Sequence, residues 1–336
     1  MDLIDVHAHI VPQRLPDGPA AGVEPRWPCV QCADGIQATV TIQGKPFREI
    51  DHRSWDSGKR MADMDAAGVS RQALSPMPEL LSYWFDPAAG LEMCRAVNQT
   101  IADMMAANPA RFSGLGCVPL QDPALAAAEL SRVKADGFAG VEIGSNINGV
   151  LPGDERFEEF FAEAQALGLS VFVHALHPIG ADRLHATPDL IPFAAFPLDT
   201  GLAAVSLVRA GIPERYPGLK LGFSHGGGAI VPLVHRLAKG WELTNGFGGL
   251  VPKTPQHYTS GFYYDNLVYD AGYLAYLVRE FAPDRVFSGT DYPYAIMEVD
   301  PSGFIDAADI ADDASLRHGA ASRFLGLANE WSETGV

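Results

Sequence analysis

The stretch LIDVHA at residues 3–8 is a short apolar run that ends at chemistry-bearing side chains, and similar runs recur along the whole chain. Each run is β-branched or apolar and leads through a loop into an amphipathic stretch. The runs are LIDVHA (3–8), RQALSP (71–76), FSGLGCV (112–118), FAGVEIG (138–144), LSVFVH (169–174), LKLGFSH (219–225), FYYDN (262–266) and RVFSGTD (285–291). Helix-like stretches lie at 57–67, 89–107, 122–135, 154–167, 197–210, 229–243 and 270–281.

This alternation predicts the fold class. Strands that alternate with helices indicate a parallel sheet covered by helices, and eight such units favour a closed barrel over an open doubly wound sheet. The 336 residues exceed the roughly 250 that a barrel of this kind needs. No GxGxxG follows the first strand, which weakens the dinucleotide-binding alternative. We therefore predict an α/β protein, a (β/α)₈ TIM barrel, with residues 1–336 forming a single domain.

Two segments do not fit the repeating unit. Residues 11–50 hold many Pro and Gly and no helical period, and they contain the alternating run ATVTIQG (38–44) followed by KPFRE. We interpret them as an insertion after the first strand, a small β-hairpin over the barrel mouth. Residues 302–327 are expected to form extra C-terminal helices packed outside the barrel.

Composition excludes several kinds of partner. Lys and Arg number 24 against 41 Asp and Glu, a net charge of −17, so nucleic acid is not expected as a partner. The start MDLIDVHAHIVP lacks the features of an export signal, and no run approaches the ~18 apolar residues of a membrane span. Four cysteines are too few for a disulfide scaffold, and the Cys29–Cys32 pair has no second pair to complete a metal site. These observations predict a cytoplasmic protein.

Histidine and aspartate gather at the ends of the predicted strands. His7 and His9 lie two residues apart, so both imidazoles project from the same face of a strand. An isolated HxH is weak evidence, but His174, His225 and Asp291 also end predicted strands. Because barrel enzymes place their chemistry at the C-terminal ends of the strands, these side chains are expected to meet. The pattern predicts a metal site.

The residue types suggest a role for each position. His7, His9, His174 and Asp291 form a three-nitrogen, one-oxygen set for one divalent ion per chain. Zinc suits this set, and Mn²⁺, Fe²⁺ or Co²⁺ can occupy it as well. Such an ion lowers the pKa of a bound water, beside which His225 is expected to act as a proton shuttle. Asp291 is expected to have a catalytic role too, by accepting a hydrogen bond from that water.

At this point the chain resembles a known family. DVHAHIVP, GVEIG, FVH, FSHGGG and GTDYP, in this order, are similar to the amidohydrolase-related decarboxylases, and in particular to the aminocarboxymuconate-semialdehyde decarboxylase-like group. The likeness runs over nearly the whole chain and includes the stretches around Phe47-Arg48, Trp55-Asp56, Ser82-Tyr83-Trp84 and Arg111-Phe112. No one of these motifs is specific, but their combination is.

The resemblance has further implications for the site. It implies one zinc ion on the four ligands, His225 as the acid–base histidine, and Arg48 of the insertion as the group that holds a substrate carboxylate. Without the resemblance, Arg48 would be interpreted as a surface arginine on a hairpin. Arg236 matches an arginine that, in the family, reaches into the neighbouring subunit's site, which implies a homodimer.

The chain departs from the family in the predicted substrate pocket. After His174 the family has Pro-Trp-Asp, where this chain has Ala175-Leu176-His177, and the Trp-lined stretch of the family reads ATPDLIPFAAFPLD at 186–199. A second family arginine after Arg236 is replaced by Thr244 or a neighbour. We therefore expect a different, less anionic substrate. His177 is either a substrate contact or a solvent-facing loop residue, and Trp84 either lines the pocket or belongs to the core.

Glu142 raises the question of a second ion. It lies near the end of the fourth strand, where binuclear relatives carry a bridging carboxylate, whereas the family has an amide and one metal. One ion is therefore preferred.

Three functions remain under consideration. The first is metal-dependent non-oxidative decarboxylation of a small unsaturated or aromatic carboxylic acid. The second is hydrolysis of an amide, a lactone or a carbon–carbon bond next to a ketone. The third is a non-catalytic binding protein. The resemblance favours the decarboxylase.

Overall fold

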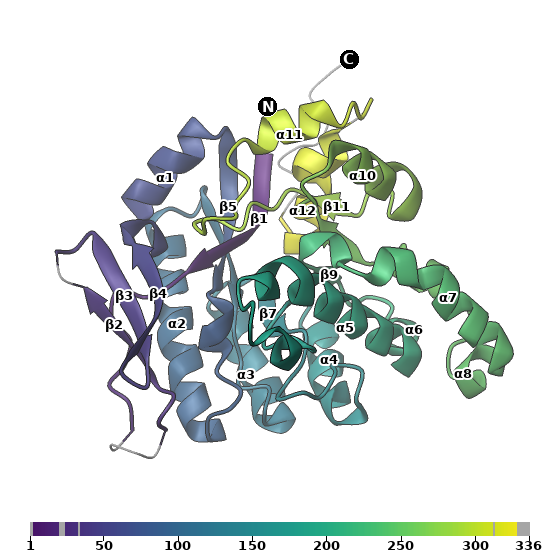
Figure 1. Cartoon of the computed structure of the whole chain (residues 1–336), viewed down its shortest axis with the longest axis horizontal. Helices are drawn as coiled ribbons and strands as arrows, with labels where there is room; N and C mark the ends of the chain where they lie inside the picture. Colours follow the sequence, from purple (N-terminus) through teal and green to yellow (C-terminus); the bar gives the residue numbers. More distant parts are fainter. Residues whose placement is uncertain (1–2, 20–23, 33, 312, 328–336) are drawn as a thin grey trace.

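The chain folds around an eight-stranded parallel barrel, shown in Figure 1. The computed structural model describes residues 3–19, 24–32, 34–311 and 313–327. The barrel strands are β1 (Leu3–Ile10), β5 (Val69–Pro76), β6 (Phe112–Gly116), β7 (Gly140–Gly144), β8 (Ser170–His174), β9 (Leu221–Phe223), β10 (Tyr263–Asp265) and β11 (Val286–Phe287). Each strand pairs in parallel with the next along the chain.

Isolated bridges between the first and last strands close the barrel. Asp5 pairs with Ser288 and Ala8 pairs with Tyr292, both in parallel. Every one of the eight predicted runs overlaps a barrel strand, so the predicted TIM barrel is confirmed. The later strands are shorter than the sequence runs, and in β9 and β11 the chemistry-bearing residues His225 and Asp291 follow the strand instead of ending it.

Helices cover the outside of the barrel between successive strands. The larger ones are α1 (Ser57–Ala66), α2 (Pro87–Ala107), α3 (Pro123–Ala135), α4 (Glu158–Ala166), α5 (Phe196–Ala210), α7 (Ile230–Leu243) and α10 (Ala271–Tyr276). Short helices complete the layer: α6 (Ile212–Arg215), α8 (Asn245–Gly249) and α9 (Pro255–Thr259). Aspartates begin several of them: Asp56, Asp122 and Asp270 each accept a backbone N–H of the first helical turn. Each predicted helical stretch overlaps one of these helices.

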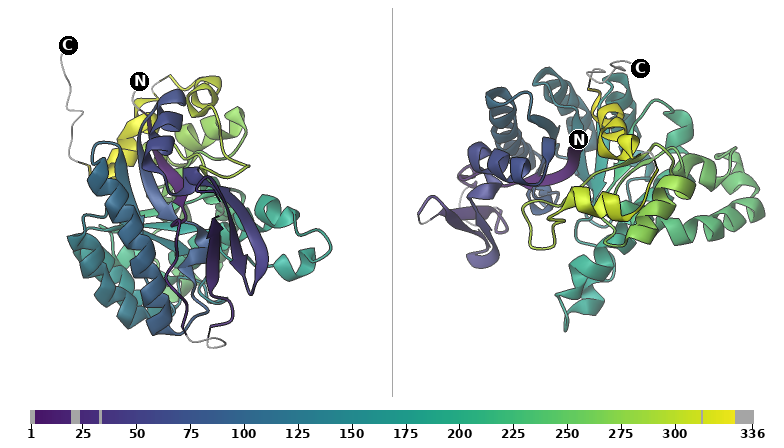
Figure 2. Two further views of the ribbon diagram at one scale, coloured as in Figure 1. Left: turned by 90° about the vertical axis from the view of Figure 1, so that its left-hand side faces the viewer. Right: turned by 90° about the horizontal axis from the view of Figure 1, so that it is seen from above.

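The insertion after β1 forms a small antiparallel sheet. Its strands are β2 (Pro28–Cys32), β3 (Gln37–Ile42) and β4 (Lys45–Asp51), in the order β2-β3-β4. The predicted hairpin is the β3–β4 pair, and β2 adds a third strand that the sequence analysis did not predict. This sheet stands beside the barrel in Figures 1 and 2. Its strand β4 carries Arg48, whose guanidinium lies over the ring of Tyr294 in the loop after β11.

The C-terminal segment is helical, as expected, but its last helix does more than pack outside the barrel. The segment contains α11 (Pro301–Ala307) and α12 (Ala320–Leu325). Phe324 of α12 belongs to one apolar cluster with Ile4, Phe172 and Phe287 of the barrel strands. Its carbonyl oxygen accepts a hydrogen bond from Ser170 at the start of β8. We conclude that α12 closes the end of the barrel opposite the mouth.

The segment after β8 leaves the barrel before α5 begins. It contains the short helical turns η4 (Ala181–Leu184) and η5 (Ile191–Ala195), which stand out from the body of the molecule in Figure 2. Within the described part of the chain, one helical segment, Ile191–Ala210, has the length and hydropathy of a membrane span, and 44 % of its most apolar window is buried. Because α5 packs in the helical layer of the barrel, core burial accounts for much of this apolar character.

Candidate active site

Three histidines and one aspartate meet at the mouth of the barrel. His7 and His9 come from β1, His174 ends β8, and Asp291 lies in the loop after β11. All four are buried, and one ligand atom from each lies within 4.8 Å of the others. The Nε2 atoms of His7 and His9 are 3.1 Å apart, and His9 Nε2 lies 3.1 Å from Asp291 Oδ1. The predicted metal-binding group is therefore assembled by strands far apart in sequence.

The hydrogen bonds of the three imidazoles orient them toward a common centre. Nδ1 of His7 donates to Asp265 Oδ2 at 2.7 Å, Nδ1 of His9 to the Pro76 carbonyl at 2.8 Å, and Nδ1 of His174 to the Ala175 carbonyl at 2.9 Å. With Nδ1 protonated, each Nε2 keeps its lone pair for an ion.

Two of the inward-facing atoms are left without partners. His174 Nε2 and Asp291 Oδ1 are buried and have no hydrogen-bond partner among the described residues. Buried polar atoms are rarely left unpaired in a native protein. The donor set and these two atoms together fit a divalent cation.

Asp265, at the end of β10, is a site residue that the sequence analysis did not select. Its carboxylate accepts hydrogen bonds from His7 Nδ1, from the backbone N–H groups of His225 and Gly226, and from that of Leu267. It therefore holds one ligand and the turn that carries His225 at the same time. The sequence did contain a signal for Asp265, because it lies near the end of the predicted strand FYYDN. Residues at the C-terminal ends of barrel strands face the mouth, where the chemistry takes place.

The charges of this cluster alter its pKa values. Burial alone would lower the pKa of His7, but the hydrogen bond to Asp265 and the nearby carboxylates outweigh it and raise the pKa to about 9. Burial lowers the pKa of His225 to about 4, and the positive charge of His7 adds to this effect. Without an ion, the site thus keeps a proton on His7 and none on His225 at neutral pH.

His225 lies beside the ligands. Its ring centroid is 5.5 Å from that of His7 and 5.2 Å from that of His174. Its Nδ1 lies 3.1 Å from Ser224 Oγ, and the residue lines the cavity in front of the cluster. Its φ of 57° is in the left-handed region, which is uncommon for a residue other than glycine and is maintained by the two backbone hydrogen bonds to Asp265.

The glycines that follow His225 permit close packing. Gly226, Gly227 and Gly228 all have positive φ, and a Cβ on Gly228 would collide with the carbonyl oxygen of Pro197. Gly228 and Pro197 both line the cavity, and α7 begins two residues further on. These glycines therefore let the backbone approach the cavity closely and lead directly into α7.

A cavity of about 1250 Å³ opens in front of the cluster and contains Arg48 on its wall. Arg48 lies on β4, and its guanidinium carbon sits 4.4 Å above the ring of Tyr294. The structure pairs Arg48 with no carboxylate among the residues that it describes. A cation placed over an aromatic ring and facing a cavity is available for an anionic ligand.

The two other predicted substrate contacts lie in different positions. His177 lines the cavity, and its Nε2 lies 2.8 Å from Glu79 Oε2. Trp84 is not among the cavity-lining residues; it stacks on His177 with ring centroids 4.6 Å apart. Arg26, from the insertion, contacts Glu79 at 2.8 Å and lies 3.9 Å above the Trp84 ring. Trp84 thus supports the cavity wall from behind.

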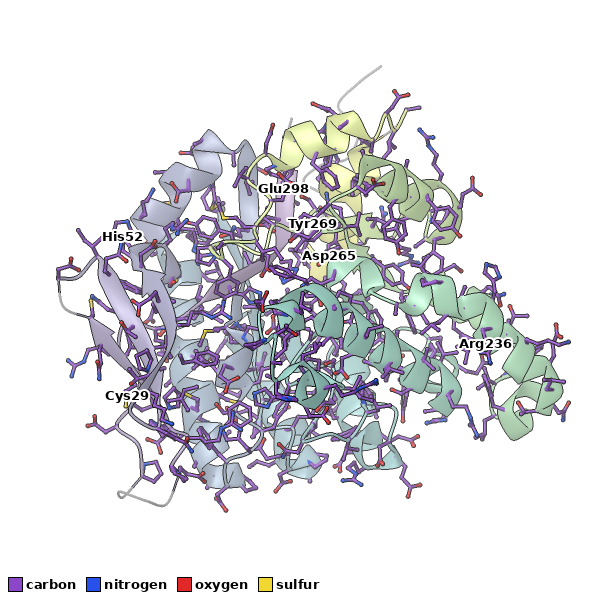
Figure 3. All side chains as sticks on the ribbon, in the orientation of Figure 1. Cys29, His52, Arg236, Asp265, Tyr269 and Glu298 are labelled. Atoms are coloured by element: carbon purple, nitrogen blue, oxygen red, sulfur yellow. The ribbon has the colours of Figure 1, made fainter. Side chains whose placement is uncertain are left out.

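Arg236 and Glu142 lie away from the open side of this cavity. Arg236 is exposed on α7 and is not among the cavity-lining residues; Figure 3 shows it at the edge of the molecule, with Asp265 near the middle. Glu142 is buried on β7, with Oε2 3.8 Å from His9 Nδ1, and burial raises its pKa to about 8. It is not part of the four-residue group.

Comparison with known proteins places the chain in a class. The amidohydrolase family model matches residues 4–327, and the chain belongs to this family. A relative from Dictyostelium discoideum, 2-amino-3-carboxymuconate-6-semialdehyde decarboxylase, is 33 % identical, with 96 % of this chain and 91 % of the relative covered.

Solved structures agree with this placement. The crystal structure of 5-carboxyvanillate decarboxylase from Sphingomonas paucimobilis has a TM-score of 0.78 and 26 % identity, and covers 97 % of this chain and 99 % of that one. The 5-carboxyvanillate decarboxylase of Novosphingobium aromaticivorans, complexed with manganese and a nitrobenzoic acid, has a TM-score of 0.72 and 25 % identity over 82 % of each chain.

Proposed function

We propose that this chain catalyses metal-dependent, non-oxidative decarboxylation of a small unsaturated or aromatic carboxylic acid. The observation that carries the proposal is the placement of an unpaired arginine, Arg48, and a neutral histidine, His225, in one cavity with the His7, His9, His174 and Asp291 cluster. Relatives that match nearly the whole chain include 2-amino-3-carboxymuconate-6-semialdehyde decarboxylase and 5-carboxyvanillate decarboxylase. Hydrolysis remains the alternative, because a metal site of this type also activates water.

The residues have distinct roles in this reaction. When bound, the divalent ion supplies Lewis acidity that polarises a substrate oxygen and draws electron density from the carbon bearing the carboxylate. Arg48 holds the carboxylate with its planar fork of donors. The carbon–carboxylate bond breaks, CO₂ leaves, and the electron pair stays on the substrate carbon. His225, being neutral, relays a proton from solvent water to that carbon, and Asp291 helps to hold the proton network in place.

We infer that the ion is a single zinc per chain, with manganese as the alternative. Three imidazole nitrogens and one carboxylate oxygen suit zinc, and they accept the other first-row divalent ions as well. Elemental analysis of purified protein should find about one ion per chain, and His174→Ala should lose it. Two ions per chain would instead assign Glu142 as a bridging ligand, and no ion in protein prepared without chelators would refute the metal site.

Release of CO₂ tests the reaction. The metal-loaded protein is assayed with muconate, resorcylate and salicylate-type acids. His225→Asn should lower kcat by about 10²–10⁴-fold while retaining the ion. His235→Asn, a change of an exposed histidine on α7, is the matched control and should leave kcat unchanged. Absence of CO₂ from every acid, with solvent ¹⁸O appearing in a carboxylate product of an ester or amide, would establish the hydrolase instead.

We infer further that the protein acts as a homodimer in which Arg236 reaches the neighbouring site. Its exposed position outside its own cavity is compatible with such a contact. A mixture of inactive Arg236→Ala and inactive His225→Asn chains should regain part of the activity, since a mixed dimer has one intact site. No recovery, with mixed dimers demonstrated by mass spectrometry, would remove Arg236 from the site.

A further inference from the structure

The cavity is larger than one small ring with a carboxylate requires. Its volume is about 1250 Å³, above the ~300–1000 Å³ that is usual for pockets of drug-sized ligands. The metal-binding group, His225 and Arg48 occupy its inner end, where the reacting atoms are expected. The rest of the cavity extends toward the helical turns that follow β8. The side chains that line this part therefore indicate which group the substrate has beyond its ring and carboxylate.

The outer part of the cavity is lined by apolar side chains. Ile191 and Phe193 come from η5, Phe196 begins α5, and Phe47 and Ile42 of the insertion sheet also line the cavity. The ring of Phe196 lies 6.3 Å from that of His174 and 6.4 Å from that of His225, so it joins this apolar lining to the inner end. Phe193 is 61 % exposed, although it lines the cavity. Exposed apolar side chains that line a cavity indicate an apolar ligand, because binding such a ligand removes their surface from water, which is favourable.

The charged groups of the outer wall are already paired with one another. Glu79 accepts from Arg26 at 2.8 Å through Oε1 and lies 2.8 Å from His177 Nε2 through Oε2. Arg26 and His177 also stack on Trp84. Both carboxylate oxygens of Glu79 are therefore engaged within the wall, and one guanidinium nitrogen of Arg26 is committed to it. Among the described residues that line the cavity, Arg48 is the cation without a carboxylate, and it lies at the inner end.

We infer that the substrate of the proposed decarboxylase carries an apolar extension, an alkyl chain or a second ring, that lies along Phe193, Ile191 and Phe196. The head of such a molecule holds one carboxylate and one metal-binding oxygen, which match the metal cluster and Arg48, a cavity arginine with no carboxylate partner among the described residues. The inference rests on the proposed function for the position of the head. The inference goes beyond that function, because it predicts an acid with an apolar extension instead of an acid that consists of one ring.

A homologous series of ligands tests this inference. The probes are 2-hydroxybenzoates with methyl, propyl, pentyl and heptyl chains at ring position 4 or 6. Their binding to the metal-loaded protein is measured by calorimetry, and their turnover by CO₂ release. Each methylene that is fully buried should strengthen binding about fourfold. With partial burial, we expect a gain of at least tenfold from methyl to pentyl in one of the two series.

Two variants locate the chain-binding surface. Phe193→Ala should reduce the gain per methylene while leaving the affinity for the methyl compound unchanged. Leu198→Ala is the matched control, because Leu198 lies nearby on the first turn of α5, is 53 % exposed and does not line the cavity. It should keep the full gain. Both side chains are largely exposed, so neither change is expected to prevent folding.

The two readouts separate this inference from the proposed function. Affinity that rises with chain length, without CO₂ from any compound, would support the apolar subsite and refute the decarboxylase. CO₂ from the methyl compound, with affinity that is flat or falls along both series, would support the decarboxylase and overturn the apolar subsite. An equal gain in wild type and Phe193→Ala would also overturn the inference, because the chain would then bind elsewhere.

Discussion

Asp265→Asn is the most informative single substitution, because Asp265 links a metal ligand to the turn that carries His225. Its Oδ2 accepts from His7 Nδ1 at 2.7 Å and from the His225 N–H at 2.8 Å. Its Oδ1 accepts from the Gly226 N–H at 2.7 Å and from the Leu267 N–H at 3.1 Å. A carboxylate accepts on both sides, whereas an amide has one acceptor oxygen and presents N–H donors on the other side.

Either orientation of the new amide is unfavourable. If its NH₂ faces His7, the imidazole moves its proton to Nε2 and loses the lone pair that should bind the ion. If the NH₂ faces Gly226, two buried backbone N–H groups lose their acceptor, at a cost of ~1–3 kcal/mol each. Changes of residues that hold a ligand typically weaken metal binding by about 10–100-fold, or about 1.4–2.7 kcal/mol. We expect Asp265→Asn to fall in this range.

Competition with a chromophoric chelator at fixed pH measures the effect, on protein whose circular dichroism matches wild type. Asp270→Asn is the matched control. Asp270 lies five residues further on and caps α10 through the Tyr273 N–H, a role that Asn fills equally well. A dissociation constant for Asp265→Asn within twofold of wild type would refute the reasoning that this carboxylate determines the tautomer of His7.

Three further outcomes are expected. Arg48→Gln should raise KM for the acid at least tenfold, because a hydrogen bond to a charged group contributes ~1.5–3 kcal/mol. Steady-state kinetics test this prediction, with the exposed Arg14→Gln variant as the control. An unchanged KM would contradict it. Glu142→Gln should leave the number of bound ions and the metal affinity nearly unchanged. Burial raises the pKa of Glu142 to about 8, so its carboxyl group is mostly neutral at pH 7. Elemental analysis that finds two ions in the wild type and one in the variant would oppose this prediction. The apparent metal affinity should rise by about tenfold per pH unit between pH 7 and about pH 9 and level off above that. The reason is that the ion must displace the proton of His7, whose pKa is raised to about 9. A chelator titration that shows no change in affinity over this pH range would count against the prediction.

Much of the barrel and its metal-binding group could be predicted from local pattern. Strand period two places His7 and His9 on one face, and closure of a parallel sheet brings the ends of β1 and β8 to one rim. The helical stretches were predictable for the same reason, since their period of 3.6 is a property of neighbouring residues. The resemblance added Arg48, which geometry along the chain does not distinguish from a surface arginine.

Other features were not predictable because they depend on contacts between distant segments. Glu79 pairs with both Arg26 and His177, 53 and 98 residues away along the chain, and so satisfies charges that would otherwise suggest a polar substrate. Phe324 closes the bottom of the barrel by packing on strands as far away in sequence as β1 and β8, although its own segment indicates only a helix.

The division between sequence and structure follows from the range of the forces involved. The sequence by itself determined the alternation of strands and helices, and with it which side chains stand at the strand ends, because these depend on backbone geometry over a few residues. The tertiary structure decided which of those side chains are held by a partner, as His7 is by Asp265 across 258 positions, and which remain free to meet a ligand, as Arg48 does. Hydrogen bonds and packing act over a few ångströms in space, and the order of residues along the chain does not specify those neighbours.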